Sequence, residues 1–417
     1  MNKLSRRNFL KSLGGIAVMA STPSIILGAN NGSRVVVIGG GFAGATAAKY
    51  LKHWAPNLNV TLIEPNTQYK SPILSNLVVN GQIPMSNITF NYNVLKQKYG
   101  VTVIHDWVQG IDATANTVEL KSGAKVDYDR LIVAPGISFN AVNGLDFKKT
   151  PHAWQSGDQV LLLKQQLTSM PKGGTFVMTI PEAPYRCPPG PYERACVVAD
   201  YLKRNNPTAK VIVLDANAGI ISEKAAFSHA FNVTYANNLE YHTNITLESV
   251  DSDRRIAITS SGDFKADVLN VIPTQSAGDI VKSTGLINDA TGRWAGVDPI
   301  SYESTALPNI HVIGDSQGTG QPKAGHIANA EAKVCADAII RLLSGNQPYQ
   351  SPMTNSACYS PISTREASWA TVVYQYNPAT QSMSAVSGSS GAANVADSRS
   401  YRDMFNWSDN LFSDTFS

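Results

Sequence analysis

The sequence of 417 residues lacks several features that would assign it to common protein classes. Its formal net charge is only +3, from 34 basic and 31 acidic residues, so it has no basic surplus of the kind that nucleic-acid binding usually shows. After the first thirty residues no segment reaches the roughly eighteen uninterrupted apolar residues that a membrane-spanning helix needs. We therefore expect no nucleic-acid partner and no integral membrane segment, and partners must be inferred from sites.

Cysteine is scarce as well, with only four residues: Cys187, Cys196, Cys335 and Cys358. Four cysteines allow three pairings, and the sequence does not choose among them. Cys196 and Cys335 fall within expected helices beside apolar positions, where a free cysteine behaves as a small buried hydrophobe, so we interpret both as structural. For Cys187 and Cys358 the residues alone leave two alternatives open, a redox-active disulfide or an inert structural one.

The first thirty residues differ from the rest of the chain. Ser5–Lys11 reads SRRNFLK, a mildly apolar stretch broken by glycine and proline follows over 13–27, and Gly28–Asn30 is a run of small residues. This pattern is similar to a twin-arginine export signal. It predicts that the mature chain starts near Asn30, folds before export and works in the periplasm, an oxidising compartment. A basic N-terminal tail is the alternative.

A complete strand, turn, helix, strand and acid unit follows the leader. Its parts are a strand over 34–38, the glycines Gly39, Gly41 and Gly44, a helix over 45–53, a strand over 60–63, and Glu64. The first glycine permits a tight turn, the second lets backbone amides approach a pyrophosphate, and the third lets the helix pack on the strand. The helix N-terminus adds free amides, and the acid is placed to bond a ribose hydroxyl. The unit predicts a dinucleotide site.

Two later turns favour FAD over a nicotinamide. Ala134-Pro135-Gly136 resembles the Ala-Thr-Gly turn of flavoproteins of the glutathione reductase type. Gly314-Asp315 ends a late strand where such flavoproteins hold the ribityl and pyrophosphate region of the flavin. We therefore expect FAD, with these candidate binding residues: Gly39, Gly41, Gly44, Glu64, Gly136, Gly314 and Asp315.

A second α/β region lacks the glycine fingerprint that would bind NAD(P)H. Its strands are expected over 175–180, 210–214 and 268–272, with a helix over 192–203. After the first of these strands, residues 181–194 read PEAPYRCPPGPYER, and prolines lack the amide donors that a pyrophosphate needs. The electron donor must therefore be something other than NAD(P)H.

These patterns predict an α/β fold with two doubly wound dinucleotide-binding-type domains, similar to glutathione reductase, plus a small C-terminal α+β domain. The expected parts are an export signal over 1–30, a FAD-binding domain from 31–150 and 300–345, a second Rossmann-like domain without an NAD motif over 151–299, and a C-terminal domain over 346–417. Within the last part, residues 381–400 are rich in Ser, Ala, Gly and Asn and predict loops.

The loop around Cys187 carries the most specific resemblance. Tyr185–Arg194 (YRCPPGPYER), Ala357–Ser360 (ACYS) and the leader closely resemble the flavoprotein subunit of flavocytochrome c sulfide dehydrogenase, and the match runs over nearly the whole chain. This resemblance implies oxidation of sulfide to sulfur or polysulfide in the periplasm, through FAD and a redox disulfide between Cys187 and Cys358. It also implies that electrons leave to a c-type cytochrome, either a subunit or a soluble protein.

Glu193, six residues after Cys187, opens the predicted helix and is a candidate general base for a thiol or hydrosulfide. A first-turn glutamate favoured by the helix dipole is the alternative. Members of the resembled family attach the flavin through a cysteine, whereas this chain has Pro72 near that position, so we expect non-covalent FAD. The chain has no Cys-x-x-Cys-His motif, so it needs a separate cytochrome, and no metal site is predicted.

Two other functions fit the same residues. A sulfide:quinone oxidoreductase shares the fold and the use of cysteines, but it must dock on a membrane, and 400–417 contains Arg402 as its single basic residue, which argues against an anionic lipid surface. The second alternative is a non-catalytic flavin-binding partner of exported sulfur-metabolism proteins.

Overall fold

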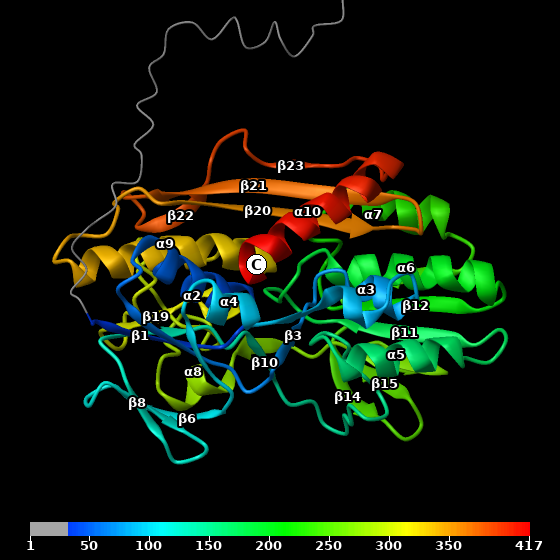
Figure 1. Ribbon diagram of the computed structural model, residues 1–417. Helices are drawn as coiled ribbons and strands as arrows, with labels where there is room; N and C mark the ends of the chain where they lie inside the picture. The colour runs from blue at the N-terminus through cyan, green and yellow to red at the C-terminus, as the bar shows by residue number, and fades with distance from the viewer. Residues whose placement is uncertain (1–31) are drawn as a thin grey trace, which may run out of the picture.

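The structure is a computed structural model that describes residues 32–417 (Figure 1). The expected twin-arginine signal at residues 1–30 lies outside the described residues, and it stays a prediction. Within the described part of the chain, no helix has both the length and the apolar content needed to cross a membrane.

The first domain is built on a five-stranded parallel sheet (Figure 1). In spatial order its strands are β19 (Ile310–Val312), β9 (Arg130–Val133), β1 (Arg34–Ile38), β2 (Asn59–Ile63) and β5 (Thr102–Ile104). β1 lies at the centre with its last four residues buried, which is why it reads as a continuous β-branched run. Helices α2 (Phe42–Trp54) and α9 (Gly325–Leu343) pack against each other beside this sheet.

The second domain contains a four-stranded parallel sheet. Its strands, in spatial order, are β13 (Leu239–His242), β12 (Lys210–Asp215), β11 (Thr175–Ile180) and β17 (Val268–Val271). α6 (Gly190–Asn205) packs on β12, and α5 (Asp158–Thr168) packs on β17. The strands and the helix that the sequence predicts for this region are confirmed within a few residues at their ends.

The C-terminal part is an antiparallel sheet with a long helix, as expected for a small α+β domain. Its elements are β20 (Met353–Pro361), β21 (Ala367–Asn377), β22 (Ser382–Ala385), β23 (Gly391–Ala392) and α10 (Ser398–Phe416). The prediction of loops over 381–400 is therefore wrong in part. β22 and β23 both pair with β21, and this pairing overrides the low strand propensity of their small residues.

This C-terminal sheet lies across both domains. β20 packs on α9 of the first domain and on α6 of the second, as the long orange strands in Figure 1 show. At the far end of α10, Phe412 and Phe416 stack among Phe42, Tyr69 and Phe90 of the first domain. The chain terminus is therefore part of the core around the start of α2.

The remaining elements are short connections and hairpins. They are β3 (Gln68–Lys70), α3 (Ser75–Val79), a 3-10 turn (Met85–Ile88), β4 (Thr89–Asn91), α4 (Asn93–Gln97), β6 (Val108–Asp112), β7 (Thr117–Leu120), β8 (Lys125–Asp127), β10 (Ile137–Phe139), α7 (Lys224–His229), a π-helical turn (Ala230–Thr234), β14 (Leu247–Asp251), β15 (Ile256–Thr259), β16 (Gly262–Lys265), β18 (Gln275–Ala277), α8 (Asp279–Ser283) and a 3-10 turn (Gly314–Ser316).

Candidate active site

A cleft of about 840 Å³ opens where the strands of the first sheet end. Its walls come from the residues that follow β1, β2, β9 and β19, which is the carboxyl edge of the sheet. Ligands of open α/β sheets bind at this edge, and the volume lies in the range of cofactor sites. The cleft is therefore where the sequence predicts the dinucleotide.

The three glycines of the motif have different roles in this cleft. Gly39 has φ +95°, and a Cβ there would lie 2.3 Å from the carbonyl oxygen of Ala134. A Cβ at Gly44 would lie 1.8 Å from the carbonyl oxygen of Gly39, so this glycine allows helix and strand to touch and does not line the cleft. Gly41 lines the cleft and precedes α2, whose first amides have no side-chain cap.

Two acids face the same cleft. Glu64 ends β2, and its Oε2 accepts a hydrogen bond from the Gly40 amide at 2.8 Å. Asp315 follows β19, and its buried Oδ1 has no hydrogen-bond partner within the described chain. Burial raises the pKa of Asp315, although the nearby Arg186 and Lys323 lower it. A buried oxygen without a partner is suited to accept a ligand hydroxyl.

These features fit FAD. The uncapped amides of α2 suit a pyrophosphate, Glu64 suits a ribose, and Asp315 suits a second set of hydroxyls. Gly136 (φ +78°) and Gly314 (φ +71°) also line the cleft. Each predicted cofactor residue except Gly44 therefore lies on the cleft wall.

Glu331 in α9 supports this site from behind and was not found by sequence reasoning. Its Oε2 accepts from the Gly314 amide and its Oε1 from the side-chain amide of Gln317, both at 2.8 Å. Burial raises its pKa to about 8. In the sequence Glu331 reads as one of the ordinary polar residues of a helix, because nothing local indicates that it is fully buried.

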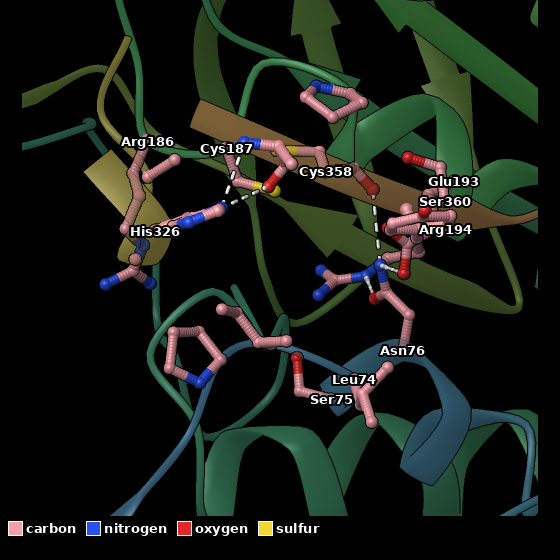
Figure 2. Close-up of a pocket in the computed structure, with 18 of the residues that line it drawn as sticks. Leu74, Ser75, Asn76, Arg186, Cys187, Glu193, Arg194, His326, Cys358 and Ser360 are labelled. Carbon is pink, nitrogen blue, oxygen red and sulfur yellow. Dashed lines mark hydrogen bonds between the residues drawn. The ribbon is translucent and has the colours of Figure 1, made fainter. Parts of the chain in front are cut away.

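A second, smaller cavity adjoins the cleft, and Figure 2 shows its lining. Its volume is about 60 Å³, room for a few groups of the size of water. Pro72, Arg186 and Gly325 line both spaces. The cavity therefore suits a very small molecule held next to the cofactor cleft.

Cys187 and Cys358 meet in this small cavity from distant parts of the chain (Figure 2). Cys187 lies in the loop between β11 and α6 with φ +59°, and its amide donates to the carbonyl oxygen of Lys323 at 2.7 Å. Cys358 lies on β20 opposite Ala370 of β21. Both thiols are free in this structure, so the structure brings the predicted pair together while the disulfide itself stays a prediction.

The thiols of Cys187 and Cys358 have strongly raised pKa values in the reduced protein. Burial raises the pKa of Cys187 to about 12, and the charge of Glu193 adds to the effect. Burial also raises the pKa of Cys358 well above the ordinary thiol range, with the charge of Cys187 as the next cause. Removal of a proton from either thiol near neutral pH therefore needs a base.

Cys196 and Cys335 are fully buried within α6 and α9, as expected for structural cysteines.

Gly190 is the first residue of α6 and follows the loop that carries Cys187. A Cβ at this position would lie 2.8 Å from the Cys187 sulfur, so only glycine lets the thiol sit at the helix start.

Glu193 lies in the first turn of α6 and lines the cysteine cavity with only 8% of its surface exposed. The side-chain amide of Asn76 donates to its Oε1 at 2.9 Å. Burial raises the pKa of Glu193 to about 8, although the hydrogen bond from Asn76 opposes this rise. A carboxyl group with this pKa beside a thiol pair exchanges protons near neutral pH, which favours the general-base interpretation.

Asn76 also holds a buried arginine. Its Oδ1 accepts from Nε of Arg194 at 2.9 Å, and the guanidinium donates further to Asn270 and to backbone carbonyls near Trp154. Arg194 is 1% exposed and lies over the Trp154 ring at 5.0 Å. Asn76 and Arg194 were missed in the sequence, because the hydrogen-bond partners that define their roles lie more than 40 residues away.

His326, labelled in Figure 2, and Trp407 also line the cavity. Nδ1 of His326 accepts from the Ala357 amide at 3.0 Å and from the indole of Trp407 at 3.2 Å. Burial lowers the pKa of His326, in keeping with a neutral ring. Trp407 reaches the cavity from α10, a contact that no local pattern indicates.

Comparison with known proteins assigns the family. The model of the central part of the flavoprotein chain of sulfide dehydrogenase (flavocytochrome c) matches 160–273, and the model of the flavin-binding part matches 350–416. Such a flavoprotein chain from Chlorobaculum thiosulfatiphilum is 53% identical over 45 residues, 11% of this chain and 94% of that sequence. The chain belongs to the flavocytochrome c sulfide dehydrogenase flavoprotein family. It is accordingly an FAD-dependent oxidoreductase of a sulfide-oxidising family, and the binding of FAD in the cofactor cleft stays a prediction.

The flavocytochrome c sulfide dehydrogenase family is part of a wider group. A pyridine nucleotide-disulphide oxidoreductase model matches 33–170. The mitochondrial sulfide:quinone oxidoreductase of Dictyostelium discoideum is 24% identical over 328 residues, 74% of this chain and 71% of that protein. The sulfide:quinone oxidoreductase structure from Aquifex aeolicus superimposes with a TM-score of 0.75 at 19% identity, over 92% of this chain and 91% of that one. The superposition shows that this chain has the fold of the Aquifex aeolicus structure.

Proposed function

We propose that this chain oxidises sulfide at a disulfide between Cys187 and Cys358 beside FAD, and that it passes the electrons to a c-type cytochrome in the periplasm. One observation carries the proposal: two cysteines from distant segments share a cavity of about 60 Å³ whose walls continue into the cofactor cleft. That volume is large enough to admit hydrosulfide.

In the first step, hydrosulfide attacks one sulfur of the disulfide, so the bond between the two cysteines breaks. The attacked cysteine becomes a persulfide, and the other leaves as a thiolate. Glu193 then takes the remaining proton of the persulfide, because its carboxylate lines the same cavity. FAD, when bound, supplies the acceptor for the two electrons that leave as the pair returns to the disulfide and releases sulfur.

The surrounding residues fix the positions of Glu193 and Cys187. Asn76 orients Glu193 through a hydrogen bond, and Arg194 fixes Asn76 from the other side. The glycine at 190 leaves room for the Cys187 sulfur at the start of α6. Trp407 and His326 line the same cavity as the thiol pair.

An anaerobic titration with sulfide, followed by flavin absorbance, tests the proposal. Near-stoichiometric sulfide is expected to bleach the flavin, and bleaching is expected to disappear in Cys187→Ala and in Cys358→Ala while FAD stays bound. Cys196→Ala is the matched control, because this buried cysteine lies outside the cavity. Full turnover in either of the first two variants would contradict the disulfide scheme, and no bleaching of the natural protein by any sulfur donor would favour a non-catalytic role.

A quinone is the second candidate acceptor, because a sulfide:quinone oxidoreductase shares most of its length with this chain. Phe412 and Phe416 are buried against the first domain, so these two aromatic side chains are not available to anchor the chain in a membrane. Reduction of a soluble cytochrome c and of a water-soluble quinone analogue, measured in parallel with sulfide, separates the two acceptors.

A further inference from the structure

A second buried carboxyl group, that of Glu223, lies close to the cysteine cavity. Glu223 precedes α7 and is only 5% exposed. Its backbone has φ +51° and ψ +39°, the left-handed region that a residue with a side chain seldom adopts. A loop glutamate normally avoids both burial and this conformation, so the position calls for a physical reason.

Ser360 connects Glu223 to the strand that carries Cys358. The Ser360 hydroxyl donates to Oε1 of Glu223 at 2.8 Å, and Ser360 itself is fully buried and lines the cysteine cavity. Ser360 follows Cys358 by two positions on β20, so their side chains project from the same face of the strand. The other oxygen of Glu223, Oε2, has no hydrogen-bond partner within the described chain.

The titratable groups whose pKa values respond to the charge of Glu223 come from three parts of the chain. They are Glu193 and Cys196 on α6, Cys187 in the loop before α6, and Cys358 on β20. The negative charge of Glu223 raises the pKa of each, and at Cys358 its effect exceeds that of Glu193. The pKa of Glu223 is itself raised to about 7 by burial, and hydroxyl groups, those of Ser368 and Ser360, oppose this rise.

We propose that Glu223 is a positioning residue of the cysteine reaction, whose charge makes Glu193 a stronger base and Cys358 a more nucleophilic thiolate. The inference rests on the proposed function, in which Glu193 takes the persulfide proton and a thiolate is released. A negative charge in a buried site raises the pKa values of neighbouring acids. The nucleophilicity of a thiolate increases with the pKa of its thiol. The hydrogen bond from the Ser360 hydroxyl holds the Glu223 carboxylate next to β20.

Glu223→Gln tests this proposal, because the amide keeps the size of the side chain and an oxygen for the Ser360 hydroxyl while it removes the charge. The measurement is the rate at which iodoacetamide alkylates Cys358 and Cys187 in the reduced protein as a function of pH, with each site assigned by mass spectrometry. Without the charge, a larger fraction of each thiol is ionised at a given pH. We expect alkylation of Cys358 about 3- to 10-fold faster in the variant below the pKa of the thiol.

Two further variants make the result decisive. Ser360→Ala removes the bond that stabilises the Glu223 carboxylate, so it is expected to accelerate alkylation in the same direction near neutral pH. Glu240→Gln changes an exposed glutamate that pairs with Lys210 and is expected to leave the curve unchanged. Thermal unfolding and FAD content confirm that each variant is folded.

An unchanged alkylation curve in folded Glu223→Gln would show that Glu223 serves only the structure and would overturn the proposal. If that variant does not fold, an unchanged curve in folded Ser360→Ala overturns it equally. The sulfide titration of the natural protein is a separate outcome. A failure of sulfide to bleach the flavin would reject the proposed function, while the alkylation curve would still report whether Glu223 controls the thiols.

Discussion

At the scale of single residues, the cysteine cavity gathers ionisable groups and removes them from water. Glu193, Cys187 and Cys358 all have raised pKa values with burial as the main cause. At Glu193 the positive charge of the buried Arg194 opposes this rise, and burial lowers the pKa of Arg194 itself to about 10. Proton transfer in this cavity therefore involves groups whose pKa values lie above those of the same groups in water.

The role of Glu193 can be tested by its pH dependence. Because its pKa is about 8, the fraction in the charged, proton-accepting form increases about tenfold per pH unit below pH 8 and levels off above it. The rate of flavin bleaching by sulfide is expected to follow this increase. Glu193→Gln is expected to lower the rate by about 10²–10⁴-fold and to abolish the part of the profile near pH 8.

Stopped-flow absorbance at several pH values makes this measurement, and the profile of the variant also corrects for the ionisation of sulfide itself. An unchanged profile in Glu193→Gln would mean that the proton leaves by another group and that Glu193 is a first-turn residue favoured by the helix dipole.

At the scale of elements, α10 connects the chain terminus to the cofactor site. Phe416 is 3% exposed and packs on Phe42, the first residue of the helix that faces the FAD cleft. Phe416→Ala is expected to lower the free energy of unfolding by about 3–5 kcal/mol and to weaken FAD retention, because the start of α2 loses its support. Denaturant unfolding and flavin fluorescence measure the two effects.

Tyr349→Ala is the control for this prediction, since that side chain is 56% exposed and its loss is expected to change little. If Phe416→Ala unfolds at the same denaturant concentration as the natural protein, α10 does not hold the cofactor domain in the way that its packing indicates.

The sequence predicted the elements that carry local signals. The β-branched run around Val36 and the spacing of the glycines at 39 and 44 are local sequence patterns, so the strand, the turn and the helix could be placed. Asn76, Glu223 and Trp407 could not be found, because their roles arise from contacts between residues at least 81 positions apart in the sequence. The cysteine pairing came from a family resemblance, since four cysteines alone permit three pairings.

At the scale of the whole molecule, the proposed site of action depends on the leader. Export through the twin-arginine route requires its arginine pair, so replacement of Arg6 and Arg7 by lysine is expected to retain the folded, FAD-loaded protein in the cytoplasm. Cell fractionation with detection of bound flavin measures this result. Recovery of the variant from the periplasm in normal amount would contradict the proposed export route and the location that depends on it.

The C-terminal sheet lies across both domains and carries Cys358, whereas Cys187 belongs to the loop of the second domain. A disulfide between them would close a loop of about 170 residues, a cross-link that strongly restricts the unfolded chain. In the proposed cycle the disulfide that reacts is thus also a cross-link between the C-terminal sheet and the second domain. Each turnover breaks and reforms this cross-link, so the reduced enzyme should be less stable and more sensitive to proteases. A supply of sulfide without an electron acceptor would leave the protein in that reduced form.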